Sequence, residues 1–273
     1  MGDTIEFGVV QGRLTKSPPG CLQWFPQDNW RNEFSVASSL GINYIEFIAE
    51  VQNNSNNPIW TDEGIFEIKQ LSKENNLTIH SLCNDYIVEN SFLLESVIRQ
   101  NEDLLSQAHK LGINKYIMPF FEKSELTHSN MIDYIKSIKH VAKVANEIDI
   151  SVCLETILNG QELIELLSKI NMPNVKIVYD TGNRVAFGHD LSNDIRLLGD
   201  NITHVHIKDK NKNNENVLLG TGLVNFESVF SAFNDINYNG PFTFETTRGN
   251  NPIETAVYNM NLVNFFRSNS KNA

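Results

Sequence analysis

The chain has 273 residues, a formal net charge of −11 and a hydrophobic content of 41%. This length fits one (β/α)8 barrel, which takes about 250 residues, and the hydrophobic content excludes an intrinsically disordered protein. The acidic balance argues against nucleic acid as a partner, because binding to a phosphate backbone requires a basic surface.

The cysteines and the first residues indicate a reduced, cytoplasmic setting. The three cysteines are widely spaced and form no CxxC motif, which is typical of free thiols. Residues 1–6 carry no signal-peptide pattern, and no apolar run approaches the ~20 residues of a membrane span. We therefore expect a cytoplasmic protein without a membrane partner.

Short β-branched segments alternate with longer amphipathic segments along the whole chain. The expected strands are 5–10, 44–48, 77–83, 115–120, 152–155, 177–180, 204–206 and 242–245. The helices expected to follow them, in the same order, are 28–40, 63–75, 92–111, 131–148, 161–170, 191–198, 226–236 and 253–266. Asp28 is the expected N-cap of the first helix, and Gly41 is its expected stop. This alternation predicts a parallel sheet, and because no linker divides the chain we expect one domain over residues 1–273.

Each of the last four expected strands ends on a side chain that can bind a metal ion: Glu155, Asp180, His206 and Glu245. Carboxylates with one imidazole suit a hard divalent cation such as Mn²⁺, Mg²⁺, Co²⁺ or Zn²⁺, whereas a soft site would recruit cysteines. The ends of successive parallel strands surround one point only in a closed barrel, whereas an open doubly wound sheet places its ligands in a single crevice. We therefore predict an α/β fold, a (β/α)8 TIM barrel, with one divalent ion at its C-terminal rim.

The seventh strand offers two histidines on the same face, because side chains two residues apart point the same way. His206 is nearer the rim and is the expected metal ligand. His204 lies one layer deeper, where we expect it to support the ligands or to belong to the core.

Other polar side chains near strand ends have more than one interpretation. Glu46 points inward from an apolar strand, where it either pairs with a neighbouring Lys or Arg or contacts a substrate hydroxyl. His80 and Asp85 end the third strand, and each either contacts substrate or serves the structure. Arg248 follows the eighth strand, where barrels bind phosphate, and Arg184 and Lys208 are further basic candidates at the rim.

Several motifs resemble one known family. They are VQGRL at 10–14, YDTGN at 179–183, HVHIKD at 204–209, GTG at 220–222 and FE at 244–245, with Glu155 upstream of YDTGN. This pattern resembles the xylose-isomerase-like barrel superfamily and, within it, the sugar and sugar-phosphate 3-epimerases and isomerases. The resemblance covers nearly the whole chain.

The resemblance implies a single divalent ion, with Mn²⁺ favoured, that is held by Glu155, Asp180, His206 and Glu245. It also implies that the ion binds two adjacent oxygens of a sugar or sugar phosphate, with Glu155 and Glu245 on opposite faces of the reacting carbon. One glutamate removes a proton and the other returns one to the opposite face, through an enediolate that positive charge stabilises. The expected activity is that of a metal-dependent isomerase or epimerase.

Two positions depart from the free-sugar epimerases of this family, which carry a substrate-binding histidine three residues after the aspartate and an arginine six residues after the histidine. This chain has Asn183 and Lys212 at those positions. Asn183 is typical of phosphosugar members and is an expected substrate contact. DNA-repair endonucleases of the same superfamily hold three zinc ions with additional histidines, one of them at the position of Asn183, so the sequence excludes that activity.

Two other functions stay open on the sequence alone. A metal-dependent dehydratase or lyase acting on a keto-polyol would need a third acid, Glu46 or Asp85, beneath the leaving group. A non-catalytic sugar-binding barrel is the alternative outside enzymes, although both candidate acid/base glutamates are present. The identity of the sugar, its phosphorylation, the native metal and assembly into a homo-oligomer are left undecided by the sequence.

Overall fold

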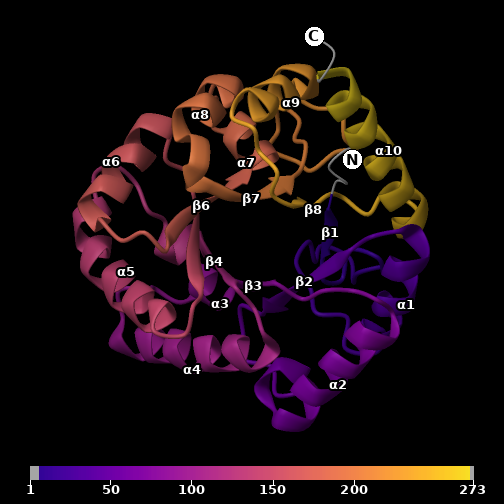
Figure 1. Cartoon of the computed structure of the whole chain (residues 1–273), viewed down its shortest axis with the longest axis horizontal. Coiled ribbons are helices and arrows are strands. Elements are labelled where there is room, and N and C mark those ends of the chain that lie inside the picture. The colour runs from indigo at the N-terminus through magenta and orange to yellow at the C-terminus, as the bar shows by residue number, and fades with distance from the viewer. Residues whose placement is uncertain (1–5, 271–273) are drawn as a thin grey trace.

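The structure, a computed structural model of the chain, describes residues 6–270. Eight parallel strands close into a barrel in the order β1 to β8, and helices surround them (Figure 1). Each strand pairs in parallel with the next, and β8 pairs with β1. The predicted (β/α)8 TIM barrel is therefore confirmed.

The elements alternate as the sequence predicted. The strands are β1 (Phe7–Val10), β2 (Tyr44–Ala49), β3 (Ser81–Asn84), β4 (Lys115–Phe120), β5 (Ser151–Thr156), β6 (Val175–Asp180), β7 (Ile202–Ile207) and β8 (Phe242–Phe244). The helices are α1 (Trp30–Leu40), α2 (Asp62–Glu74), α3 (Tyr86–Glu89), α4 (Glu95–Leu111), α5 (Met131–Asn146), α6 (Gly160–Ile170), α7 (Thr181–Ala186), α8 (Leu191–Leu198), α9 (Phe226–Asp235) and α10 (Pro252–Ser270). Short 3-10 turns are η1 (Pro58–Trp60), η2 (Glu122–Ser124) and η3 (Gly199–Asn201). None of the helices within residues 6–270 has the length and apolar character that a membrane crossing demands.

The start of α1 differs from the prediction. Asn29 occupies the N-cap position that was expected for Asp28, because the amides of Asn29 and Trp30 first bond to the carbonyl of Pro26 in a turn. The expected Asp28 cap is therefore wrong. Gly41 ends the helix as predicted, in a left-handed conformation with φ of 78°.

The first and third strands are shorter than expected. The strand predicted at 77–83 narrows to β3, so His80 lies at the N-terminal end of that strand and not at its rim end. The strand predicted at 5–10 begins at residue 7, and residues 1–5, which include most of the segment expected to lack a signal peptide, lie outside the described part of the chain.

Two short helices, α3 and α7, were not predicted. Each spans so few residues that no amphipathic period can show in the sequence. The helix expected at 92–111 begins at Glu95, because a turn in which the amide of Leu94 bonds to the carbonyl of Ser91 precedes it.

The register of the sheet brings four metal-binding side chains to one end of the barrel. Asp180 of β6 is the register partner of His206 of β7, and His206 is in turn the partner of Thr243 of β8. Glu155 is the next-to-last residue of β5, and Glu245 directly follows β8. All four side chains thus lie at the C-terminal ends of their strands.

The interior of the barrel is filled by side chains. The hydroxyl of Tyr44 lies 2.5 Å from Thr243 Oγ1, which in turn lies 2.8 Å from His204 Nε2. Gly8 makes room for the tyrosine ring, because a Cβ at this position would lie 1.9 Å from two ring carbons of Tyr44. A hydrogen-bonded polar layer therefore lies beneath the rim.

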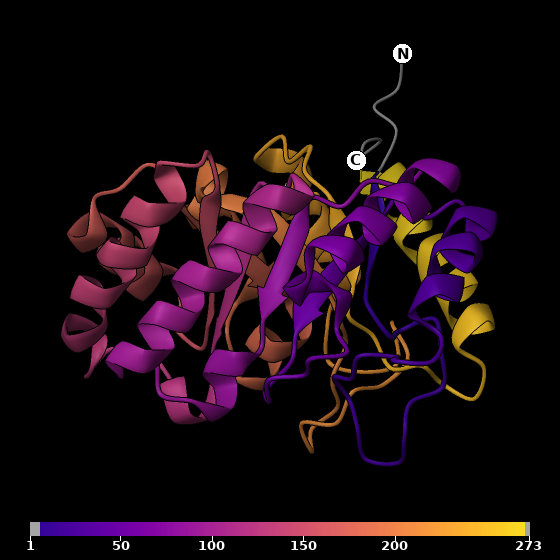
Figure 2. The same ribbon diagram turned by 90° about the horizontal axis from the view of Figure 1, so that it is seen from below.

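Two long loops project from one end of the barrel in side view (Figure 2), loop 11–29 after β1 in indigo and loop 208–225 after β7 in orange. Both follow the C-terminal ends of their strands, so they border the rim that carries the metal-binding side chains. Asp209 holds the second loop in place, because its carboxylate accepts hydrogen bonds from the amides of Gly220, Gly222 and Val224 at 3.0, 2.8 and 3.0 Å.

Candidate metal centre

Side chains from four consecutive strands converge at the C-terminal rim. One ligand atom each from Glu155, Asp180, His206 and Glu245 lies within 4.8 Å of every other. His206 Nδ1 is 3.6 Å from Glu155 Oε2, 4.0 Å from Asp180 Oδ2 and 3.2 Å from Glu245 Oε2. The imidazole nitrogen thus faces three carboxylates at once.

The donor set fits a divalent cation. All four side chains are buried, and the buried Nδ1 atom of His206 has no hydrogen-bond partner among residues 6–270. Three carboxylates packed together out of water repel one another unless positive charge lies between them. Oxygen donors with one imidazole nitrogen suit Mn²⁺, Mg²⁺, Co²⁺ or Zn²⁺. These four residues therefore have the chemistry and the spacing to hold one such ion.

Glu46 of β2 fixes the orientation of the ligand histidine from beneath. Its carboxylate lies 2.8 Å from His206 Nε2 through Oε1 and 2.7 Å from His204 Nε2 through Oε2. The sequence left open a basic partner or a substrate hydroxyl for Glu46. The structure instead gives it two histidine partners, and Glu46 does not line the pocket above the centre.

His204 belongs to the layer below the ligands. It is fully buried, and its Nε2 atom lies within hydrogen-bond distance of both Glu46 and Thr243. Burial lowers the pKa of His204 to about 4, against the opposing effect of Glu46. His204 is therefore neutral and supports the centre through Glu46.

Lys208 places a buried positive charge beside the carboxylates. Its Nζ atom lies 3.0 Å from Asp180 Oδ2 and 2.7 Å from Glu245 Oε2. Burial opposes the ammonium form, but the neighbouring carboxylates outweigh it and raise the pKa of Lys208. Gly182 leaves space for the lysine stem, because a Cβ at position 182 would lie 2.8 Å from Lys208 Cγ.

Asn183 connects two of the candidate ligands. Its amide N–H donates to Asp180 Oδ1 at 2.6 Å, so Asp180 is also the N-cap of α7. The side-chain Nδ2 of Asn183 donates to Glu155 Oε1 at 2.9 Å. This asparagine therefore sets the position of Glu155 relative to Asp180.

Arg13 reaches the centre from the loop after β1, and no role was predicted for it. Its Nη2 atom lies 3.4 Å from Glu245 Oε1 and donates to Gln23 Oε1 at 2.6 Å, while Nη1 donates to the carbonyl of Thr246 at 2.9 Å. The only signal in the sequence was its place in VQGRL, directly after the first strand.

The two glutamates differ in electrostatic environment. Burial raises the pKa of Glu155, with further repulsion from Asp180 and Glu245. Burial also opposes ionisation of Glu245, but Lys208 and His206 outweigh it and hold the pKa of Glu245 below its ordinary value. Unequal environments of this kind favour different protonation states for two neighbouring carboxyls.

A pocket of about 310 Å³ opens over the centre. Its floor and walls combine the ligand side chains with apolar groups from several loops. The lining residues are Leu22, Gln23, Val51, Cys83, Asp85, Val88, Pro119, Phe121, Glu122, Glu155, Asn183, Phe187, His206, Lys208, Lys210, Asn214 and Glu245. Glu155 and Glu245 both line this pocket.

Three basic or imidazole side chains proposed from the sequence do not reach this pocket. His80 lies at the other end of β3, where its ring centroid is 4.0 Å from that of Tyr44. Arg248 donates to the carbonyls of Gly12 and Leu22 at 2.8 and 2.9 Å and so binds the loop after β1. Neither His80 nor Arg248 is among the residues that line the pocket, and their expected substrate contacts stay predictions. Arg184 is likewise buried, and its Nη1 donates to the carbonyl of Leu158 at 2.9 Å.

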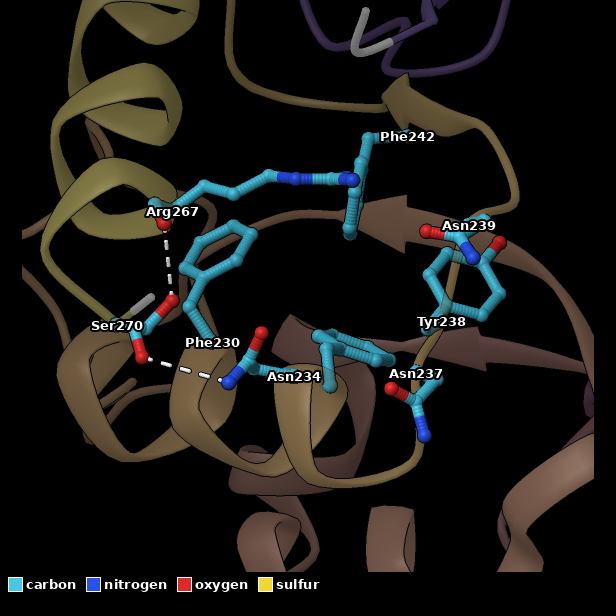
Figure 3. Close-up of a pocket in the computed structure, with 9 residues that line it drawn as sticks. Phe230, Asn234, Asn237, Tyr238, Asn239, Phe242, Arg267 and Ser270 are labelled. Atoms are coloured by element: carbon cyan, nitrogen blue, oxygen red, sulfur yellow. Dashed lines mark hydrogen bonds between the residues drawn. The ribbon is translucent and has the colours of Figure 1, made fainter. Parts of the chain in front are cut away.

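A separate pocket of about 160 Å³ lies between α9, the start of β8 and α10 (Figure 3). Aromatic rings and asparagines line it, and the guanidinium of Arg267 lies 5.5 Å from the ring centroid of Phe242. None of its lining residues is a carboxylate or a histidine. This pocket is not the metal centre.

Fold and centre together define a parallel α/β barrel with a carboxylate–histidine site at its C-terminal rim. The chain belongs to the xylose isomerase-like TIM barrel family, whose family model matches residues 34–264.

Relatives and solved structures agree with this assignment. D-psicose 3-epimerase of Ruminiclostridium cellulolyticum is 24% identical over 243 residues, which are 80% of this chain and 80% of that protein. L-ribulose-5-phosphate 3-epimerase of Escherichia coli is 21% identical over 235 residues, which are 79% of this chain and 81% of that protein. The crystal structure of D-psicose 3-epimerase from Clostridium cellulolyticum H10 with D-tagatose has a TM-score of 0.75 at 18% identity, and covers 96% of this chain and 99% of that one. The structural likeness shows a shared fold.

Proposed function

We propose that the protein is a metal-dependent epimerase or isomerase of a ketose or ketose phosphate. The observation that carries the proposal is the convergence of Glu155 and Glu245 on one pocket, from strands β5 and β8, together with Asp180 and His206. The names of the relatives, D-psicose 3-epimerase and L-ribulose-5-phosphate 3-epimerase, support a sugar or sugar phosphate as the substrate class.

Glu155, Asp180, His206 and Glu245 would hold one divalent ion, with Mn²⁺ favoured. When bound, such an ion supplies Lewis-acid stabilisation of the negative charge that develops on substrate oxygens. Glu46 keeps the His206 ring in the orientation that turns Nδ1 toward the carboxylates.

The two glutamates would perform the proton transfers. One carboxylate removes the proton on the carbon next to the carbonyl, and the C–H electron pair moves into an enediolate of the substrate. The other glutamate then donates a proton to the opposite face, the electron pair forms the new C–H bond, and the configuration is inverted. Asn183 positions Glu155 for this step, and Lys208 with Arg13 surrounds Glu245 with positive charge.

Solvent exchange tests this function. The protein is loaded with Mn²⁺ and incubated in D₂O with a panel of ketoses and ketose phosphates, and deuterium at the carbon next to the carbonyl is measured by NMR. Incorporation together with the epimeric product supports the proposal, and the preferred member of the panel identifies the substrate and its phosphorylation. No exchange with any member, from a protein shown to hold metal, would contradict it.

A dehydratase is the second candidate, and one observation favours it. Asp85 lines the pocket as a third acid, whereas Glu46 is engaged by its histidines. Burial raises the pKa of Asp85 to about 7, so near neutral pH a fraction of this carboxyl is protonated and can donate a proton to a leaving hydroxyl. A product that has lost one water, seen by mass spectrometry in the same incubations, would favour this activity.

The non-catalytic alternative and the cellular setting stay predictions. Saturable sugar binding without exchange or product would indicate a binding protein. One domain over residues 1–273, a cytoplasmic location and assembly into a homo-oligomer are expectations to be checked by limited proteolysis, fractionation and light scattering.

A further inference from the structure

A second cavity of about 480 Å³ adjoins the pocket over the metal centre. Three residues, Gln23, Val51 and Asp85, line both spaces, so the two communicate at the rim. The complete lining of the second cavity comes mainly from the loops after β1 and β2 and consists of Gln23, Trp24, Phe25, Gln27, Ile48, Glu50, Val51, Gln52, Asn53, Asn54, Ser55 and Asp85. Its volume falls in the range of roughly 300–1,000 Å³ that is typical of small-molecule sites.

The lining of this second cavity suits a neutral ligand with many hydroxyl groups. Five of its twelve lining residues carry a side-chain amide, and each amide can donate to and accept from a hydroxyl group. None of the lining residues is Lys, Arg or His, so the cavity has no cation for a phosphate or carboxylate group. The side chains of Gln52 and Asn53 are exposed and form no hydrogen bond within residues 6–270, so they are available to a ligand.

Asp85 lies at the junction of the two spaces with an unused acceptor. It is buried, with 7% of its surface exposed, and Cys83 Sγ lies 3.3 Å from its Oδ1 atom. Its Oδ2 atom has no hydrogen-bond partner in the described part of the chain. A buried acceptor without a partner is costly, and a hydroxyl donor from a ligand would satisfy it. The backbone amide of Asp85 bonds to the carbonyl of Ala49 at 2.8 Å, which holds the residue in place.

We propose that the enzyme takes a ketose that carries a glycosyl unit, with the keto end over the metal centre and the glycosyl unit in the second cavity. Asp85 accepts a hydrogen bond from a ligand hydroxyl where the two spaces meet. The ring of Trp24 offers an aromatic face to the glycosyl unit. This assignment rests on the proposed function for the keto end, but the second cavity itself is defined by its own residues.

Direct binding separates the second cavity from catalysis. The Mn²⁺-loaded protein is titrated calorimetrically with D-fructose and with two glucosyl-fructoses, maltulose and isomaltulose, which carry the glucosyl unit on O4 and O6. At least one disaccharide should bind about tenfold more tightly than fructose, as one or two added hydrogen bonds and an aromatic contact would give. In the double variant Gln52→Ala with Asn53→Ala, and separately in Trp24→Ala, this preference should fall to about twofold or less.

A matched control uses an exposed amide pair on the other side of the barrel. Asn146 of α5 and Gln161 of α6 are exposed and make no side-chain hydrogen bond within residues 6–270, and these helices lie across the barrel from α1 and α2 (Figure 1). Asn146→Ala with Gln161→Ala should keep the full preference for the disaccharide.

The outcomes distinguish the two proposals. Three results would overturn the glycosyl assignment. They are equal affinity for fructose and both disaccharides, no binding of fructose or of either disaccharide, and a disaccharide preference that is unchanged in both cavity variants. A second result would separate the proposals: disaccharides bind more tightly than fructose, this preference depends on Gln52 and Asn53, and none of these sugars exchanges deuterium. That result would support the glycosyl site in the second cavity and reject the catalytic proposal.

Discussion

Glu46 is a buried carboxylate that lies within hydrogen-bond distance of two histidines, His204 and His206. Burial alone would raise its pKa, but the interactions with His206 and His204 outweigh burial and hold the pKa of Glu46 below its ordinary value. Because Glu46 binds Nε2 of His206, the Nδ1 atom is the one that faces Glu155 and Glu245. Carboxylate partners of this kind keep a metal-binding imidazole in one orientation.

We expect Glu46→Gln to lower the affinity for Mn²⁺ by about 10–100-fold, because an amide replaces one of two acceptor oxygens by a donor. Calorimetric titration with Mn²⁺ measures this change. Glu63→Gln, at an exposed position of α2, should bind the ion as the wild type does. A folded Glu46→Gln variant with unchanged affinity would show that Glu46 does not orient His206.

The variants Glu155→Gln and Glu245→Gln keep the shape of each side chain and remove its basicity. If both glutamates transfer protons, each variant should lose about 10³-fold or more in kcat, because the two groups act as a unit. Each should still exchange the substrate proton with D₂O from one epimer only. Metal content is measured in parallel, since both residues are also candidate ligands. A metal-loaded variant with a near wild-type rate would reject the two-base mechanism.

The sequence pattern could not predict which individual residues contact each other across the barrel. Glu46 and His206 are 160 residues apart, and Arg13 and Glu245 are 232 apart. The period of a strand places a side chain on one face, but it does not identify the residue opposite. The grouping of Glu155 with its three companions could be predicted because successive strand ends share a rim. The partners of those residues could not.

At the scale of elements, α1 stabilises the loop that carries Arg13. Glu33 of α1 is buried, and its carboxylate accepts hydrogen bonds from the amides of Gly12 and Leu14 at 2.9 and 3.2 Å. Burial raises the pKa of Glu33 to about 7, although these two hydrogen bonds and Arg248 oppose the shift. The protonated form of this carboxyl is therefore favoured in the folded protein.

This shift predicts a pH-dependent contribution to stability. The folded pKa of Glu33 lies above the unfolded one, so the folded state binds more protons and stability falls as pH rises from about 4.5 to about 7. Urea unfolding measures the free energy of unfolding at pH 5 and at pH 8. The decrease in this free energy from pH 5 to pH 8 should be larger in the wild type than in Glu33→Gln, by on the order of 2–3 kcal/mol. The variant is its own control, because every other group titrates in both proteins. Equal pH dependence would contradict the assignment.

Long periodic elements could be predicted, and short ones could not. Both β4 and α8 begin and end where the residue pattern placed them. The helix α7 was missed because its start depends on one side chain, the carboxylate of Asp180 that accepts from the amide of Asn183. Loop conformations likewise follow from such individual contacts, so the two adjoining cavities at the rim had no signature in the sequence.

At the scale of the whole molecule, the closed barrel gathers like charges at one point. Glu155, Asp180 and Glu245 are all buried at the rim, and Lys208 lies within 3.0 Å of two of them. The ammonium group compensates part of their charge in the protein without metal. Loss of a buried partner leaves the remaining charges uncompensated, which is strongly destabilising.

We expect Lys208→Met to destabilise the metal-free protein by about 3–5 kcal/mol and the Mn²⁺-loaded protein by clearly less, because a bound ion supplies positive charge to the same carboxylates. Urea unfolding in EDTA and in Mn²⁺ measures both values. Lys212→Met, at an exposed position of the same loop, should change neither. An equal loss with and without metal would show that Lys208 does not balance the charge of the centre.

The double use of Asp180 makes the first turn of α7 a natural spectroscopic reporter. One oxygen of Asp180 caps the helix through the amide of Asn183, and the other faces the imidazole of His206. Any change in electron density at the carboxylate is therefore transmitted to a single backbone N–H. The NMR chemical shift of the Asn183 backbone amide should therefore change in proportion to the fraction of centres that hold a metal ion. This measurement requires neither substrate, nor turnover, nor an attached label.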